Sequence, residues 1–393
     1  MNVEKIRKDF PALDAGKQLI YFDNACTTLR PVQVMQKMNE YYKEYPSCAG
    51  RSNHRLSMKV NEEVMKARKN IANFFNAKDD SEVIFTRNTT ESINLIANAF
   101  KLKREDIVLG SDKEHNSNLL PWLLAERRIG ITRKIFKFND IEDFKNKIKG
   151  VKLVSIVHTS NVDGTSNDVK EMIKISHENG AVVLLDAAQS APHKELNVRK
   201  LDADFLACSG HKMLGPSGIG VLYGKKELLE QLTPFMMGGD TVNNTTYDGF
   251  EIKALPERFE AGLQNYSGII GFGEAVNYLK KVGLDNIESH EKELNKRITG
   301  GLVEINANII GPKDANLRSG IASFNIGNIN PHDISLMLNA KNIMLRSGMY
   351  CVHSWFNANK INGSVRASLY LYNTKEEVEI FMKHIKDIAK LVR

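Results

Sequence analysis

From about residue 83 onward, the chain alternates short apolar runs with longer stretches of helical periodicity. The apolar runs have the length and β-branched composition of strands, and they cover 82–87, 106–111, 151–160, 181–189, 204–210 and 218–224. Several are apolar throughout rather than alternating, which is typical of strands buried on both faces. The pattern predicts an α/β fold with a mostly parallel, doubly wound sheet.

The pattern changes after about residue 275. A long amphipathic stretch over 273–305 leads into a mixed region, and the chain closes with a charged helix over 375–392. We therefore predict a large domain over 16–275 and a smaller α+β domain over 276–393. The N-terminal segment 1–15 is expected to be part of the smaller domain.

The composition is ordinary for a globular protein. The 393 residues are 42% hydrophobic and 26% charged, and no apolar run reaches membrane-spanning length. The first residues contain no apolar leader segment, so we expect a cytoplasmic protein without a membrane partner.

Charge and cysteine usage narrow the function further. The net charge is +7, but the lysines are interspersed with acidic residues. This favours solvated helix faces and anionic ligands over nucleic acid. The four cysteines lie far apart without a CxxC pair, which argues against disulfides and a structural zinc site, so we expect no metal.

Polar residues gather where the predicted strands end. They are Thr89, Thr90, His115, Asn161, Asp186, Gln189, His211 and Lys212. Ligands of open α/β sheets bind beyond the carboxyl ends of the strands. We therefore predict one composite site.

Lys212 and Asp186 are the most informative pair in this group. Lys212 lies in a turn that also carries Ser209 and His211, and Asp186 ends the preceding apolar run. A lysine can hold an aldehyde covalently, and a carboxylate can keep a pyridine nitrogen protonated. The pair indicates pyridoxal 5'-phosphate (PLP) chemistry.

The remaining strand-end residues do not establish the site when each is taken alone. Thr89 and Thr90 suit a phosphate at a helix N-terminus, but also an ordinary helix cap. His115 could stack on a flat cofactor or simply be solvated. Gln189 could reach the cofactor's phenolic oxygen, and Asn161 could do the same or orient substrate.

Two residues of the C-terminal part suit substrate chemistry. Cys351 has Arg346 and His353 close in sequence, and cationic neighbours raise the thiolate fraction of a cysteine, so it could be a nucleophile or an inert thiol. Arg366 could clamp a carboxylate with its two-pronged guanidinium or be a surface charge.

With these residues assembled, the chain resembles the class V aminotransferase family of fold-type I PLP enzymes, and within it the group II (SUF-type) cysteine desulfurases and selenocysteine lyases. The resemblance runs nearly end to end. It rests on these segments: TTESINLIANAF, KEHNSNLLPW, SNVDGT, LLDAAQSAPH, SGHKMLGPSGIGVLYG, RFEAGLQN, RSGMYC and RASLYLYNT.

The resemblance implies a role for each candidate. Lys212 would bind the cofactor and shuttle protons, Asp186 would face the pyridine nitrogen, and His115 would stack on the ring. Gln189 would bond the phenolic oxygen, and Asn161 would position cofactor and substrate. The phosphate of the cofactor would be bound by Thr89, Thr90, Ser209 and His211.

The resemblance also implies a reaction. Arg366 would hold the substrate carboxylate, and Cys351 would accept sulfur from L-cysteine, with Arg346 five residues before it as the group II pattern expects. L-alanine would be released, and the sulfur would pass to an acceptor protein for iron–sulfur cluster assembly or another thiolation pathway. A homodimer is implied as well.

Five residues at four places depart from the family pattern. Leu263 replaces a threonine that reaches the neighbouring subunit's phosphate, and Met349-Tyr350 replaces two histidines before the cysteine. Gly50 replaces a histidine, and Cys26 occupies an alanine-like place near the substrate. This extra thiol could be idle, relay sulfur or alter substrate choice.

The departures keep other functions open. One is a selenocysteine lyase, or a class V aminotransferase or epimerase, in which Cys351 is not essential. Another is a scaffold protein that has kept the fold and lost turnover. Activity that survives the loss of Cys351 would indicate the first, and a protein that ignores added PLP would indicate the second.

Overall fold

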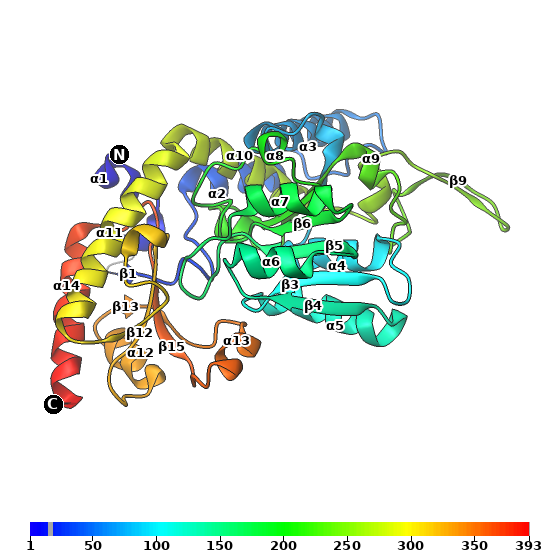
Figure 1. The fold of residues 1–393 in the computed structure, drawn as a ribbon. Coiled ribbons are helices and arrows are strands. Elements are labelled where there is room, and N and C mark those ends of the chain that lie inside the picture. Colours follow the sequence, from blue (N-terminus) through cyan, green and yellow to red (C-terminus); the bar gives the residue numbers. More distant parts are fainter. Residues whose placement is uncertain (15–18, 393) are drawn as a thin grey trace.

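The computed structural model describes residues 1–14 and 19–392 and has a seven-stranded sheet at its centre (Figure 1). The strand order is β2 (Val83–Thr86), β8 (Gly220–Gly224), β7 (Phe205–Ser209), β6 (Val182–Asp186), β5 (Val151–Val157), β3 (Ile107–Ser111), β4 (Thr132–Phe136). β8 is antiparallel to both neighbours and the other pairings are parallel. The predicted α/β fold with a mostly parallel sheet is confirmed.

Both faces of this sheet are buried under helices, which explains the uniformly apolar strands. On β6, Leu184 packs into one hydrophobic cluster while Val183 and Leu185 pack into another. The helices that follow the strands are α4 (Thr89–Ala99), α5 (Asn116–Ile129), α6 (Ile141–Lys147), α7 (Val169–Glu178), α8 (Val198–Leu201) and α9 (Lys226–Leu229). Adjacent strand residues therefore enter opposite layers of the core.

Several elements were not predicted. β4 is an edge strand whose residues are mostly exposed or half-buried, so it lacks the apolar signal of the central strands. Two long helices, α2 (Val32–Glu44) and α3 (Arg55–Phe75), precede the region where the alternation begins and pack on α10 (Tyr266–Val282). A polar hairpin of β9 (Val242–Thr245) and β10 (Phe250–Ile252) projects from the body (Figure 1).

A second, antiparallel sheet has the order β11 (Asn308–Ile310), β12 (Ile321–Asn325), β15 (Ser364–Ser368), β14 (Arg346–Gly348). The helices α11 (Leu284–Glu304) and α14 (Lys375–Ala389) pack side by side against this part (Figure 1). Two shorter helices complete it: α12 (Pro331–Asn339) and α13 (His353–Ala358).

The amphipathic stretch 273–305 is divided between α10 and α11. The break is at Gly283, whose φ of +88° favours glycine. The predicted domain boundary after residue 275 stays a prediction and falls inside α10. The predicted start at residue 16 lies outside the described residues.

The N-terminal segment connects the two sheets. α1 (Val3–Arg7) places Arg7 against Glu377 of α14, at 2.7 Å from its Oε1. β1 (Ile20–Tyr21) then pairs with β13 (Ile343–Met344), and Asp23 bridges to Ser368 on β15. The next residues return to the large sheet, so 23–28 lie between the two.

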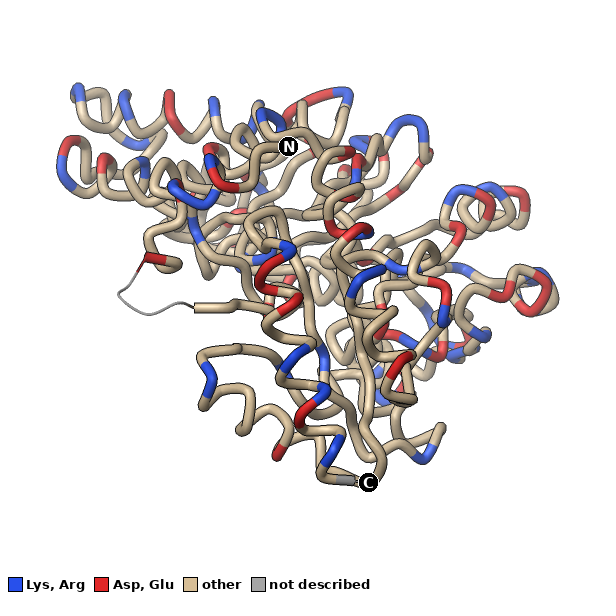
Figure 2. The backbone as a smooth tube through the Cα atoms, turned by 90° about the vertical axis from the view of Figure 1, so that its left-hand side faces the viewer, with Lys and Arg blue, Asp and Glu red and all other residues tan. Residues whose placement is uncertain are grey.

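Charged residues of both signs are interspersed along the helices in the view of Figure 2. Among the described residues, no helix is long and apolar enough to cross a membrane. Within 1–14 and 19–392, no cluster of His, Cys, Asp and Glu could hold a metal ion.

Candidate active site

One cavity of about 220 Å³ collects every residue that the sequence singled out for the site. It lies at the carboxyl ends of β2, β3, β5, β6 and β7 and is closed from the other side by the small sheet. The predicted residues that line it are Thr89, Thr90, His115, Asn161, Asp186, Gln189, Ser209, His211, Lys212, Arg346, Cys351 and Arg366.

Lys212 follows β7 in a single short turn, Gly210–Lys212. Burial lowers the pKa of its amine, and Arg366 adds to this effect while Asp186 opposes it. A lowered pKa increases the fraction of uncharged amine, which is the form that condenses with an aldehyde.

Asp186 ends β6 and is 2% exposed. Its Oδ1 accepts the Ala188 N–H at 2.9 Å, and burial raises the pKa of the carboxyl. Gln189 lies beside it and donates from Nε2 to the Ala25 carbonyl at 2.7 Å. The buried Gln189 Oε1 has no partner among the described residues, so this wall offers an unused acceptor to a polar ligand.

His115 is the N-cap of α5. Its Nδ1 accepts the Ser117 N–H at 3.1 Å, and the Ser117 hydroxyl lies 2.8 Å from that of Thr90. Burial lowers the pKa of His115 to about 3, and the positive charges of Lys212 and Arg366 contribute. The imidazole is therefore neutral at ordinary pH and presents a flat ring to the cavity.

The N-terminus of α4 forms the anion-binding end. Asn88 caps the helix by accepting the Glu91 N–H at 3.0 Å. Ser209 at the end of β7 accepts the Thr89 N–H at 2.8 Å, and the two hydroxyls lie 2.6 Å apart. Hydroxyls at the positive end of a helix suit a phosphate group.

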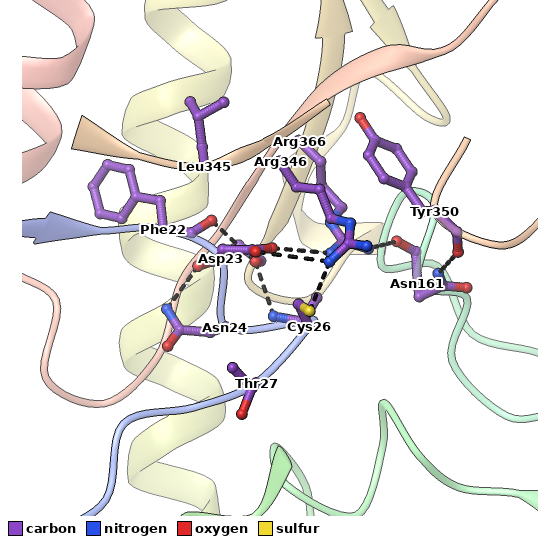
Figure 3. A network of polar contacts seen from close by, with 12 residues as sticks. Phe22, Asp23, Asn24, Cys26, Thr27, Asn161, Leu345, Arg346, Tyr350 and Arg366 are labelled. Carbon is purple, nitrogen blue, oxygen red and sulfur yellow. Dashed lines mark hydrogen bonds and ion pairs between the residues drawn. The ribbon is translucent and has the colours of Figure 1, made fainter. Parts of the chain in front are cut away.

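Arg366 of β15 closes the cavity from the small sheet (Figure 3). It is 2% exposed, donates to the Asn161 carbonyl at 2.9 Å and pairs with Asp23 at 3.3 Å. Its Nε has no partner among the described residues. A buried guanidinium with spare donors suits a substrate carboxylate.

Cys351 stands exposed at the rim, on a turn with unusual backbone geometry. Tyr350 and Cys351 both adopt left-handed conformations, with φ of +52° and +61°. The Asn116 N–H donates to the Cys351 carbonyl at 2.7 Å, and Asn161 Nδ2 donates to the Tyr350 carbonyl at 2.8 Å. These contacts with the start of α5 and with the loop after β5 hold the thiol at the cavity mouth.

A second thiol lies inside the same cavity. Cys26 is half-buried, and its Sγ lies 2.6 Å from the Arg346 guanidinium (Figure 3). The same guanidinium lies 3.8 Å from the Asp23 carboxylate. Arg346 is thus shared between a carboxylate and a sulfur.

Sequence reasoning assigned no role to several residues of the site. Asp23 is one of them, and it pairs with both Arg346 and Arg366. Ser117 links His115 to Thr90, and a hydroxyl residue two positions after a helix cap was an available signal. The other lining residues without an assigned role are Ala25, Asn88, Val157, Ala188 and Tyr350. Their placement depends on tertiary contacts.

Residues 20–381 match the family described as Aminotransferase class-V. The chain belongs to the class V aminotransferase family. It is 41% identical to a probable cysteine desulfurase of Pyrococcus abyssi, with 99% of this chain and 98% of that protein covered. A probable cysteine desulfurase of Halalkalibacterium halodurans is 39% identical, over 98% of each chain.

Solved structures of such enzymes share the fold of this class V aminotransferase family member. The apo cysteine desulfurase of Thermococcus onnurineus has a TM-score of 0.95 and 40% identity, with 98% of each chain covered. An Escherichia coli cysteine desulfurase in an S-sulfonic acid form has a TM-score of 0.92 and 31% identity, covering 100% of this chain and 99% of its own.

The protein is a PLP-dependent enzyme of fold-type I. The residues of the cavity fit this cofactor, because Lys212 offers an amine for the aldehyde and Asp186 a buried carboxyl for the pyridine nitrogen. The α4 N-terminus offers hydroxyls for the phosphate, and the unpartnered Gln189 Oε1 marks a wall built for a polar ligand.

Proposed function

We propose that this protein is a cysteine desulfurase that converts L-cysteine to L-alanine and receives the sulfur on Cys351 as a persulfide. The observation that carries the proposal is the position of Cys351 at the mouth of the cavity that also contains Lys212 and Asp186. A thiol at that point can reach a substrate sulfur while the amino-acid end of the substrate lies deeper.

When bound, PLP supplies an electron-withdrawing ring that stabilises negative charge on the substrate's α-carbon. Lys212 would provide the amine that links to the cofactor and would then move a proton to and from that carbon. Asp186 would hold a proton at the pyridine nitrogen, and the neutral imidazole of His115 would face the ring. The phosphate would be bound by Thr89, Thr90, Ser209 and His211.

Arg366 orients the substrate. Its buried guanidinium is fixed by the Asn161 carbonyl and Asp23, which leaves the Nε donor for the substrate carboxylate. Arg346 assists from β14. Clamping the carboxylate aims the substrate sulfur toward the rim of the cavity.

Cys351 performs the sulfur transfer. Its thiolate attacks the substrate sulfur, the new S–S bond forms, and the bond between that sulfur and the substrate's β-carbon breaks. The electron pair stays on the β-carbon, which takes up one proton, and the α-carbon regains the proton that Lys212 removed, so that L-alanine is formed. Because Cys351 is exposed, an acceptor thiol can collect the sulfur without entering the cavity.

The proposal also includes a homodimer and a use for the sulfur that the enzyme releases. A homodimer would cover large apolar side chains that are exposed on α2, α3 and the loop before α10, namely Tyr42, Met58, Met65 and Leu263. The sulfur would serve iron–sulfur cluster assembly or another thiolation pathway. Four unpaired cysteines suit the reducing cytoplasm.

The test is to incubate the purified holoenzyme with L-cysteine and measure both products. We expect L-alanine, together with one added sulfur on the Cys351 peptide by mass spectrometry. Cys351→Ser should lose the persulfide and slow alanine formation roughly 10²-fold, while PLP absorbance stays unchanged.

Cys48→Ser is the matched control, because it removes a thiol that does not line the cavity. It should behave like the wild type. Alanine formation that is unaffected by Cys351→Ser would contradict the proposal, and activity on L-selenocysteine alone would favour a selenocysteine lyase.

A further inference from the structure

The Cys26 thiol is a reactive group that the proposed reaction does not use. It lines the same cavity as Lys212 and Cys351, and its Sγ lies 2.6 Å from the Arg346 guanidinium (Figure 3). Buried cysteines that serve only packing are surrounded by apolar side chains, as Cys208 is in the core of the large sheet. Cys26 instead faces a cation inside a polar cavity.

The backbone around Cys26 is fixed on both sides. The Cys26 N–H donates to the Asp23 carbonyl at 3.1 Å, and the Ala25 N–H donates to the Ser368 hydroxyl at 2.9 Å. On the other side, the Thr28 N–H donates to the His211 carbonyl at 2.9 Å. The thiol is therefore held in place between the Lys212 turn and the small sheet.

The two thiols differ in their exposure to solvent. Cys351 is exposed at the rim, whereas Cys26 is half-buried deeper in the cavity. Arg346 contacts the Cys26 sulfur directly, and Arg346 and Lys212 both line the cavity that the two thiols share. A cation beside a sulfur stabilises negative charge on that sulfur.

We propose that Cys26 is a second sulfur-carrying thiol, which takes the outer sulfur from the Cys351 persulfide and stores it inside the cavity; this rests on the proposed desulfurase function. A persulfide extends the reach of Cys351 by about 2 Å, the length of an S–S bond. Both cysteines line the cavity that L-alanine vacates, so the transfer takes place in the space that the product leaves.

The transfer is balanced without another reagent. Cys26 gives up its proton and attacks the outer sulfur of the Cys351 persulfide. The bond between that sulfur and Cys351 Sγ breaks, and its electron pair remains on Cys351 Sγ, which takes up the proton. Nothing is oxidised or reduced overall, and the step reverses when Cys351 delivers sulfur to an acceptor.

The consequence is that Cys351 is freed for another turnover before any acceptor arrives. Without reductant or acceptor, the wild-type holoenzyme should form a burst of L-alanine about twice as large as that of Cys26→Ala. Mass spectrometry should find an added sulfur on both the Cys351 and the Cys26 peptides. Cys26→Ser, which keeps the size of the side chain, should behave like Cys26→Ala.

Three outcomes decide the inference. An equal burst in the wild type and Cys26→Ala, with sulfur on Cys351 and none on Cys26, would overturn it and leave the desulfurase function standing. In Cys351→Ser, Cys26 should stay unloaded; if it is loaded there, it takes sulfur directly from the substrate and the relay is wrong. No alanine and no sulfur on Cys351 would overturn both proposals.

The controls separate chemistry from folding. PLP absorbance and the urea-unfolding midpoint should be the same in Cys26→Ala, Cys26→Ser and the wild type. Cys48→Ser should keep the wild-type burst, because Cys48 does not line the cavity.

Discussion

The Lys212 end and the Cys351 end of the cavity are built in different ways. At the Lys212 end, the polar side chains stand at the carboxyl ends of neighbouring parallel strands, and Asp186 is 2% exposed. At the Cys351 end, one turn with two left-handed residues, of which Cys351 is exposed, is held by hydrogen bonds from Asn116 and Asn161. A strand ladder fixes the first end, whereas a few contacts across the cavity fix the second.

Replacement of Lys212 should produce the largest effect. Lys212→Ala removes both the amine that holds PLP and the group that moves the α-proton, so alanine formation should fall by at least about 10³-fold. Borohydride treatment followed by mass spectrometry should find no cofactor bound to the variant protein. Lys212→Arg is the control, since it keeps a cation there but cannot link to an aldehyde, and activity in it would contradict this role.

The different construction of the two ends explains why the Lys212 end was easier to predict from the sequence than the Cys351 end. Strand ends of a parallel sheet converge at one edge, so the positions of Asp186 and Lys212 after two apolar runs were sufficient to place them together. The Cys351 turn carries no such local rule. Its place beside the cavity came from a family resemblance, and its anchors are at the start of α5 (Asn116) and in the loop after β5 (Asn161).

The same reasoning explains what the sequence did not reveal. The pairing of Asp23 with Arg366 joins residues 343 positions apart, and no pattern in either segment indicates it. The edge strand β4 is too polar to resemble the central strands. Cys26 was visible as a departure from the family, but its contact with Arg346 depends on how the two sheets are packed.

Loosening the Cys351 end should have an intermediate effect. Asn161→Ala removes the donor to the Tyr350 carbonyl and keeps the backbone carbonyl that binds Arg366. Loss of one such hydrogen bond costs about 1 kcal/mol, which corresponds to roughly fivefold in rate. We expect persulfide formation on Cys351 to slow by about that factor, and iodoacetamide to alkylate Cys351 faster in the PLP-free protein.

Asn359→Ala provides the comparison for this variant. The Asn359 side chain donates to the Trp355 carbonyl of its own helix, at 2.8 Å, and makes no contact across the cavity. It should leave both rates unchanged. If Asn161→Ala slows turnover without changing the alkylation rate, Asn161 acts on the cofactor or substrate rather than on the turn.

The burial of side chains at the Lys212 end should also affect how protein stability depends on pH. This is the smallest of the expected effects. His158 follows β5 and is 8% exposed, and its Nδ1 has no partner among the described residues. Burial lowers its pKa to about 3, and Lys194 contributes, whereas an unperturbed histidine titrates near pH ~6.5. Between these two values, the unfolded chain binds a proton that the folded protein does not.

The free energy of unfolding should therefore decrease as the pH falls through this window, by up to about 1.4 kcal/mol per pH unit for each such histidine. Urea unfolding of His158→Leu between about pH 4.5 and pH 7 should show a shallower decrease than the wild type. His384→Leu, which removes a half-buried histidine from α14 beside the small sheet, is the matched control. If both variants show an equally shallow decrease in the free energy of unfolding, burial at the Lys212 end is no greater than elsewhere in the protein. The two ends of the cavity would then differ in geometry alone.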